Sequence, residues 1–196
     1  LESIVNDYQR TEVSAGAYYH LGELYSTLKW DLEKAKEYFD KVNKESNKSL
    51  FSSSSKSKST AITLYQKTEK EIELINLKTS QKEGLDSTLN TSIITPTKSL
   101  PELYYQLADL EAFSFARYSE SINIFEKIIL EFPETDFKPK SIFALIFVYE
   151  QLNDSLKSQL NRKILLESYP GSEYASYLSG NDFKENDTQR LLFKES

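Results

Sequence analysis

The feature that most limits how this chain can fold is an internal repeat. The segment YQRTEVSAGAYYHLGELY, from Tyr8, matches FPETDFKPKSIFALIFVY, from Phe132, without a gap at a constant shift of 124 positions. The turn that opens both segments returns as YPGSEY from Tyr169, 37 positions after Phe132. Repeats of about 34 residues are typical of stacked helical hairpins, because each unit buries its apolar face only against its neighbours.

Each copy of the turn combines a stop signal for one helix with a start signal for the next. Pro133 and Pro170 end a helix because proline has no backbone donor. Thr11, Thr135 and Ser172 then stand where an N-cap belongs, with a hydroxyl that can accept from a free amide of the next helix. The pattern therefore predicts a new helix directly after each of these three residues.

A fourth copy begins at Pro101, where PELYYQLADLEAF aligns with AGAYYHLGELYST at a shift of 86. Small residues are expected where the two helices of a hairpin cross, at Gly22, Ala35 and Ala108. The first and third hairpins each carry one extra residue in the inner turn. Residues 1–8 align with the end of a second repeat helix, so the chain is expected to begin within a repeat, with a helix before it.

The spacing of apolar residues divides the chain into helices and connections. Helices are expected at 12–28, 32–46, 57–78, 101–113, 118–132, 138–152, 154–168 and 173–179. The predicted parts are an N-terminal repeat segment (1–46), a Ser-rich turn with the long helix of a degenerate repeat (47–78), a flexible linker (79–100), a C-terminal repeat pair (101–180) and a polar tail (181–196). The Ser-rich stretch 51–59 is expected to be mobile. Leu191, Leu192 and Phe193 of the tail are candidates to cap the last helix.

Composition excludes several classes of protein. With only 5 Gly and 5 Pro, the chain lacks the turns and phosphate-binding loops of a parallel α/β enzyme. Its net charge of −6 argues against binding to nucleic acid, because the phosphates of nucleic acids are usually bound by clustered lysine and arginine residues. The absence of cysteine excludes disulfides and zinc–thiolate sites. No apolar run approaches the ~20 residues that span a bilayer, so no direct membrane span is expected.

The repeat resembles the tetratricopeptide (TPR) family. The fold expected from this resemblance is all-α: antiparallel helix hairpins stacked into a right-handed superhelical solenoid. The motifs EFPETDFKPKSIFAL and SYPGSEYASYL are similar to those of bacterial envelope TPR proteins, namely the outer-membrane assembly lipoprotein of the BamD type and the Tol–Pal-associated cell-division coordinator. The resemblance covers about 1–46 and 101–179. It implies a non-catalytic adaptor, periplasmic or associated with the outer membrane.

A second set of aromatic and acidic residues falls where TPR side chains line the concave groove. These candidate partner-binding residues lie one position after the core tyrosines and one turn further on: Tyr19, Glu23, Tyr105, Asp109, Phe143 and Phe147. Aromatic anchors beside carboxylates suit a protein or peptide partner of basic or apolar character. TPR domains that clamp a C-terminal carboxylate use Lys and Asn at such positions, so the resemblance implies that this chain is not a carboxylate clamp.

No catalytic, metal or cofactor site is predicted. His20 is the only histidine, and no nucleophile motif accompanies it. The many acidic pairs are expected to lie on solvated helix faces. Two functions remain open: an interaction scaffold that binds a partner in its groove, and a structural spacer whose aromatic residues contact only neighbouring repeats. Exposure of Tyr19, Tyr105 and Phe143 on one concave face favours the first function, and their burial against neighbouring helices counts against it.

Overall fold

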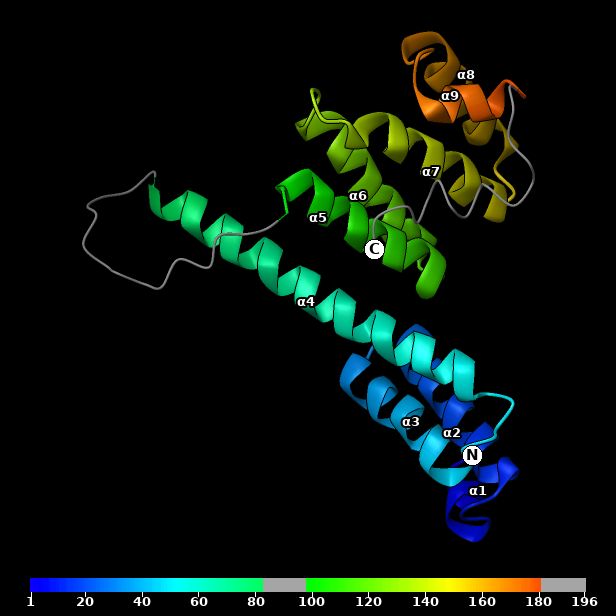
Figure 1. Cartoon of the computed structure of the whole chain (residues 1–196). Coiled ribbons are helices and arrows are strands. Elements are labelled where there is room, and N and C mark those ends of the chain that lie inside the picture. The colour runs from blue at the N-terminus through cyan, green and yellow to red at the C-terminus, as the bar shows by residue number, and fades with distance from the viewer. Residues whose placement is uncertain (83–97, 181–196) are drawn as a thin grey trace. The chain divides into compact units, whose positions relative to one another are not determined.

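A computed structural model describes residues 1–82 and 98–180, and every element in these two ranges is helical, as the sequence predicted (Figure 1). The polar tail and most of the predicted linker lie outside these ranges. In chain order the elements are α1 (Glu2–Asp7), α2 (Glu12–Leu24), η1 (Tyr25–Lys29), α3 (Leu32–Glu45), α4 (Ser52–Lys82), α5 (Leu100–Asp109), η2 (Leu110–Ser114), α6 (Tyr118–Glu131), α7 (Phe137–Gln151), α8 (Ser155–Ser168) and α9 (Glu173–Leu178).

The chain divides into two compact units. The N-terminal unit comprises Leu1–Lys70 together with Phe113–Arg117, and the C-terminal unit comprises Glu71–Ala112 and Tyr118–Ser196. The division falls inside α4, whereas the sequence pattern placed the linker at 79–100. Within that predicted linker, residues 79–82 continue α4.

In the N-terminal unit, α2 packs along α3, and α1 packs against α2. The crossing of α2 and α3 is close because Gly22 faces the ring of Phe39, and Ala35 is fully buried beside it in α3. Ala108 is likewise fully buried in α5. All three predicted small positions are therefore buried, and Gly22 is confirmed as a point of close approach.

Gly22 provides the first testable prediction. A Cβ atom at this position would lie 2.6 Å from a ring carbon of Phe39, whose side chain is 1% exposed and has no space to move into. Overpacking costs about 1–3 kcal/mol, more than the ~1 kcal/mol that alanine gains over glycine in a helix. We expect Gly22→Ala to lower the free energy of unfolding by about 1–2 kcal/mol, measured through the fluorescence of Trp30.

Gly16→Ala is the matched control. Its Cβ would lie 3.1 Å from the ring of Phe51, which is half-buried and can yield. The gain in helix propensity then offsets the contact, so the free energy of unfolding should change by less than about 0.5 kcal/mol. Equal effects of the two substitutions would show that the Phe39 contact does not limit the approach of α2 and α3.

The helix starts follow the predicted caps with one correction. Thr11 and Ser14 form a reciprocal capping box at α2, and the hydroxyl of Ser172 accepts from the amide of Ala175 at α9. Thr135 is not the N-cap of α7: that position belongs to Asp136, which makes no side-chain cap. Thr135 lies one residue earlier, where its hydroxyl still accepts from the amide of Phe137 at 3.4 Å and its carbonyl accepts from the amide of Lys138.

The extra residue predicted in the first and third hairpins is accommodated by a π-helical turn. Both π turns, η1 and η2, stand at the end of the first helix of a hairpin, and a π turn holds one residue more than an α turn. In the first hairpin the amide of Asp31 donates to the carbonyl of Tyr25, six residues back. In the hairpin without a π turn, the amide of Asp154 donates to Tyr149, only five residues back.

A left-handed residue closes each of these three turns. Trp30 has φ 50°, Ala116 has φ 54° and Asn153 has φ 57°. Trp30 and Ala116 differ by the repeat shift of 86, and Asn153 falls one position short of the shift of 124, as the missing π residue requires. Asp31 and Asp154 then cap α3 and α8 by accepting from the amides of Lys34 and Lys157. The three hairpins therefore repeat in backbone geometry as well as in sequence.

The Ser-rich stretch is helical, which corrects the expectation that it is a mobile turn. Helix α4 begins at Ser52, five residues before the predicted start. Ser55 and Ser59 are buried, and the hydroxyl of Ser59 donates to the carboxylate of Asp40 at 2.6 Å. Small residues at this spacing form one face with the buried Ile62, and that face packs within the N-terminal unit.

A three-ring cluster joins the segment Phe113–Arg117 to the rest of the N-terminal unit. Trp30, Tyr65 and Phe115 meet edge to face in all three pairs, with ring centroids 5.4–5.6 Å apart. The guanidinium carbon of Arg117 lies 3.5 Å from the centre of the Trp30 ring. These residues come from distant parts of the sequence, so nothing in the local pattern predicted the cluster.

In the C-terminal unit, α5 to α9 form a continuous series of packed hairpins (Figure 1). Each helix contacts the next in the chain, and the first helices of successive hairpins also contact one another, α5 with α7 and α7 with α9. The core side chains come mainly from the facing sides of α5, α6 and α7. The fully buried ones include Leu103, Phe125, Ile128, Phe143, Leu145, Ile146 and Val148.

Candidate protein-interaction site

The predicted groove aromatics take part in a contact that recurs between successive hairpins. An aromatic residue at the start of one first helix packs on an aromatic residue of the preceding first helix. The three pairs, with the distances between ring centroids, are Tyr19–Phe51 at 4.9 Å, Tyr105–Phe137 at 5.7 Å and Phe143–Tyr174 at 5.2 Å. The sequence separations are 32, 32 and 31 residues. The shorter separation belongs to α7, the helix without a π turn.

These contacts decide how much of each predicted aromatic reaches solvent. Tyr105 is 4% exposed and Phe143 is fully buried, whereas Tyr19 and Phe147 are half-buried. Tyr105 and Phe143 therefore serve as packing surfaces between hairpins, and only Tyr19 and Phe147 offer ring surface to a partner. Partner binding by any of the four stays a prediction.

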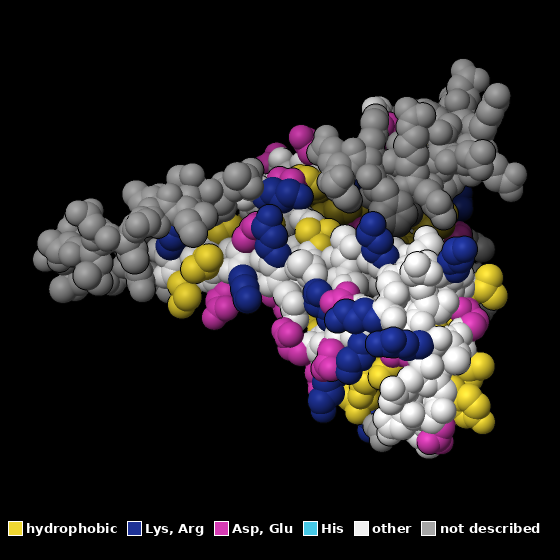
Figure 2. Space-filling view, turned by 60° about the horizontal axis from the view of Figure 1, so that its bottom comes forward, with side chains coloured by type: hydrophobic (Ala, Val, Ile, Leu, Met, Phe, Trp, Pro, Cys, Tyr) yellow, Lys and Arg dark blue, Asp and Glu magenta, His cyan; other side chains and the backbone are white. Residues whose placement is uncertain are grey.

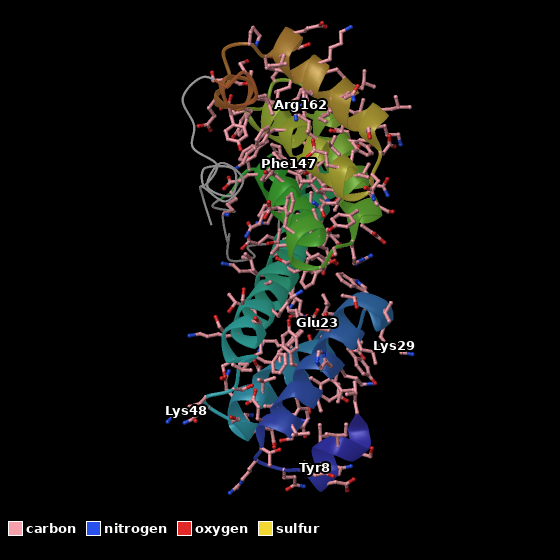
Figure 3. The ribbon with its side chains drawn as sticks, turned by 90° about the vertical axis from the view of Figure 1, so that its right-hand side faces the viewer. Tyr8, Glu23, Lys29, Lys48, Phe147 and Arg162 are labelled. Atoms are coloured by element: carbon pink, nitrogen blue, oxygen red, sulfur yellow. The ribbon has the colours of Figure 1, made fainter. Side chains whose placement is uncertain are left out.

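In the N-terminal unit, the acidic residue of the predicted site already has a partner. Glu23 lies on α2 and is labelled in Figure 3. Its carboxylate is 3.4 Å from the ammonium of Lys58 on α4, so the two side chains form an ion pair. The Oε1 atom of Glu23 accepts no hydrogen bond. Lys58 also donates to the carbonyl of Ser114 at 2.7 Å. Burial and the charge of Glu23 raise the pKa of Tyr19, opposed by a hydrogen bond with Ser54. This pair holds α4 against α2.

In the C-terminal unit, the corresponding pair is Tyr105 and Asp109, which is buried and lacks some of its hydrogen-bond partners. Tyr105 and Asp109 stand one turn apart on α5, and each carries a buried oxygen without a hydrogen-bond partner, Oη of Tyr105 and Oδ1 of Asp109. Lys140, from α7, places its ammonium 4.5 Å from the centre of the Tyr105 ring. Buried polar atoms are usually paired in native proteins, so these two neighbouring oxygens keep unused capacity to accept hydrogen bonds.

The electrostatics of this pair follow from burial. Desolvation raises the pKa of Asp109 to about 7, against the opposing charge of Lys140. Burial, with the charge of Asp109 and the nearby Tyr174, raises the pKa of Tyr105 well above its ordinary value. Tyr105 therefore stays a neutral hydroxyl, and Asp109 changes its charge near neutral pH. Asp109 is half-buried as a residue, and its Oδ1 atom is fully buried.

Phe147 lies on α7 and is labelled in Figure 3. Its ring meets Phe143 edge to face at 4.9 Å, and Phe143 in turn contacts Tyr177 of α9 at 5.6 Å. Phe147 is therefore held by the repeat contact while part of its ring stays accessible. It offers an apolar anchor on the helix that also supplies Lys140.

The six predicted residues do not belong to a single unit. Tyr19 and Glu23 lie in the N-terminal unit, and Tyr105, Asp109, Phe143 and Phe147 lie in the C-terminal unit. Sequence reasoning missed the two lysines, Lys58 and Lys140, that face the acidic residues. No local signal marks them, because each comes from the following first helix and meets the acid only through tertiary packing.

The remaining chemistry of the described residues is limited. His20 is exposed on α2, with its ring 5.6 Å from Tyr19 and 5.5 Å from Phe51. Among the residues described, no group of His, Cys, Asp and Glu is arranged to hold a metal ion. On the face shown in Figure 2, basic and acidic side chains are interspersed. None of the helices described is long and apolar enough to cross a membrane.

No protein-family model, no curated protein and no solved structure matches the chain. The description of the site therefore depends on its own geometry. Three features define it: a carboxylate of raised pKa, a buried hydroxyl and an accessible phenyl ring. We name Tyr105, Asp109 and Phe147 the α5–α7 site.

Proposed function

We propose that this chain is a non-catalytic protein-interaction scaffold of the TPR type. Three observations support the proposal: the recurring hairpin turn, the contacts between successive first helices, and the recurring aromatic pair between hairpins. Proteins built from such repeats present the first helices of their hairpins to ligands. The α5–α7 site lies on those helices.

The observation that carries the proposal is the orphan carboxylate oxygen of Asp109 beside the orphan hydroxyl of Tyr105. Both oxygens can accept hydrogen bonds from an arginine or lysine side chain of a partner. Because both are buried in the free chain, binding requires a local opening of the site. Phe147 then packs on the apolar part of the same segment. The proposed partner is therefore a protein segment with a basic residue followed or preceded by an apolar one.

The test is selection of peptides from a random library on the full chain, with affinities measured by fluorescence anisotropy. We expect selected peptides to contain Lys or Arg and to lose about tenfold in affinity to Asp109→Asn, the loss of one charged hydrogen bond. The affinity should also rise between pH 6 and 8, as Asp109 ionises, and Asp109→Asn should remove that rise. Glu131→Gln, which changes an exposed acid of α6, is the matched control.

The second candidate function is a structural spacer within a longer repeat array. The burial of Tyr105 and Phe143 against the next helices favours it, because these aromatic surfaces are already used between neighbouring hairpins. A spacer predicts that the library yields no peptide sensitive to Asp109→Asn. Selection of basic peptides that bind both forms equally would also remove the α5–α7 site from the proposal.

The cellular place of the scaffold rests on the sequence resemblance to bacterial envelope TPR proteins. We propose that it works in a complex of the periplasm or outer membrane, on the strength of the motifs EFPETDFKPKSIFAL and SYPGSEYASYL. Fractionation of cells that express the natural protein would check this. Recovery in the cytoplasmic fraction would contradict the location and leave the scaffold proposal intact.

A further inference from the structure

The turn between η2 and α6 departs from the other hairpin turns at the residue that should cap the next helix. The three turns share one backbone geometry, and their left-handed residues are Trp30, Ala116 and Asn153. The residue that follows is aspartate in two of the turns, and Asp31 and Asp154 each cap the next helix. In the third turn this residue is Arg117, whose side chain has no acceptor and cannot cap α6.

The residue before the left-handed position also differs in this turn. It is the exposed Lys29 in the first hairpin, and in the α7–α8 turn it is Leu152, which is 44% exposed. In the third turn it is Phe115, which is only 1% exposed. The geometry of the turn does not require phenylalanine or arginine at these two positions, because the other two turns close without them. The reason for both residues must therefore lie in what they contact.

Phe115 and Arg117 are held by two aromatic residues of the N-terminal unit, Trp30 after η1 and Tyr65 of α4. The ring of Phe115 meets Trp30 at 5.4 Å and Tyr65 at 5.6 Å, edge to face in both pairs. The guanidinium carbon of Arg117 lies 3.5 Å from the centre of the Trp30 ring, in cation–π contact. Trp30 therefore contacts both side chains that distinguish this turn from the other two.

Helix α4 also contacts the backbone and the charge of the same segment. The ammonium of Lys58 donates to the carbonyl of Ser114 at 2.7 Å. Burial raises the pKa of Glu69, opposed by a hydrogen bond from Tyr65 and by the charge of Arg117, so this carboxylate attracts the arginine. We name the four residues that contact the segment the Trp30 site: Trp30, Lys58, Tyr65 and Glu69. The site fits an aromatic ring followed two residues later by an arginine.

We propose that the Trp30 site binds partner segments of the form aromatic-X-Arg, and that the chain's own Phe115, Ala116 and Arg117 occupy it as an internal competitor. Aromatic and arginine side chains are the commonest anchors of protein interfaces. The internal segment carries two costs, a left-handed alanine and a helix start without a side-chain cap. A partner segment without these costs competes with it on favourable terms.

This inference goes beyond the proposed function, because the Trp30 site shares no residue with the α5–α7 site and lies in the other unit. The two sites also recognise partners differently. The α5–α7 site uses the carboxylate of Asp109, whereas the Trp30 site uses stacking on an aromatic ring. Asp109→Asn should therefore leave binding at the Trp30 site unchanged, and failure of one proposal leaves the other standing.

The experiment first empties the site and follows Trp30, the only tryptophan of the chain, by its fluorescence. The emptied variant carries Phe115→Lys and Arg117→Asp, which copy Lys29 and Asp31 of the first hairpin. It should fold, because the first hairpin closes the same turn with these residues, and circular dichroism checks its helix content. We expect the emission of Trp30 to shift to longer wavelength as its ring becomes solvated.

The second step adds a labelled synthetic peptide of residues 110–121, LEAFSFARYSES, to the full chain and measures fluorescence anisotropy. The peptide should bind the emptied variant at least about tenfold more tightly than the wild type, whose own segment competes at a high effective concentration. Binding should return the Trp30 emission to shorter wavelength. The same peptide with Phe115→Ala and Arg117→Ala is the control and should lose at least about tenfold in affinity.

Two further variants of the chain separate the site from general effects on folding. Leu152→Lys makes the matched change in the α7–α8 turn and should leave the Trp30 emission and peptide binding as in the wild type. Arg117→Ala keeps the buried Phe115 in place, so it tests the cation–π contact with little risk to the fold. It should raise the affinity for the peptide by a smaller factor than the double change.

Four results would overturn the proposal. Unchanged Trp30 emission in the folded emptied variant would show that the segment does not occupy the site. Equal affinity of the peptide for the wild type and the emptied variant would place its binding elsewhere. No binding to the emptied variant at millimolar peptide would make the internal contact ordinary packing. Self-association of the wild type that the emptied variant abolishes, seen by sedimentation, would assign the site to the same segment of a second copy.

Discussion

Replacing Phe143 by alanine should lower the free energy of unfolding of the C-terminal unit by about 4 kcal/mol, the usual loss for a fully buried phenylalanine. The side chain is 0% exposed and contacts three aromatic rings, those of Phe147, Tyr174 and Tyr177. Two of these rings belong to α9. The substitution should therefore release α9 from α7 in addition to weakening the core.

Hydrogen exchange measures both effects. The amides of α9 should exchange at least about tenfold faster in Phe143→Ala, as expected when a terminal element loses its docking contact. Leu130→Ala, at an exposed leucine, should change stability by less than about 0.5 kcal/mol and leave α9 unchanged. Unaltered protection of α9 in Phe143→Ala would show that the aromatic pair does not join these hairpins.

Asp109→Asn should stabilise the C-terminal unit above neutral pH. The folded-state pKa of Asp109 is about 7, above its ordinary value of 3.8. Between pH 3.8 and pH 7, Asp109 is therefore protonated in the folded state and ionised in the unfolded state. The stability that this proton contributes is fully present below pH 3.8 and is lost as the pH rises through 7. Since one pKa unit corresponds to about 1.4 kcal/mol, the shift from 3.8 to about 7 corresponds to a loss of roughly 4 kcal/mol.

Urea unfolding at pH 5 and pH 8, followed by circular dichroism, tests this expectation. The wild type should lose stability between the two values, and Asp109→Asn should lose less, so that the variant is the more stable protein at pH 8. The same substitution is expected to weaken partner binding, because it removes the charge that a basic ligand would meet. Greater stability combined with weaker binding is typical of functional residues. If both proteins respond equally to pH, Asp109 is ionised in the folded state and the buried-carboxylate interpretation is wrong.

Several features of the fold were predictable because they depend on neighbours in sequence. The capping hydroxyls of Thr11 and Ser172 act on amides three residues away, so their effect is visible in the local pattern. The extra residue of the first and third hairpins was detectable as a break in the register, and a π turn absorbs it. Thr135 shows the limit of such reasoning, because Asp136 takes the N-cap position beside it.

The candidate site was predictable only in part. The repeat alignment correctly paired Tyr19 with Tyr105 and Glu23 with Asp109, since both pairs lie one turn apart on first helices. It did not predict that Lys58 would form an ion pair with Glu23, whereas Asp109 is buried with a raised pKa. That difference arises from the following helix in each unit, which local sequence does not specify.

The sequence by itself determined an all-helical chain, the order of its hairpins and most of their boundaries. These properties follow from helical periodicity, proline stops and caps, which act over a few residues. Only the tertiary structure decided that the serines at the start of α4 form a helix, because burial of Ser55 and Ser59 outweighs their weak helix propensity. It also decided which aromatic residues are buried. Tyr105 and Phe143 became contacts between hairpins because Phe137 and Tyr174, about 32 residues further on, cover them.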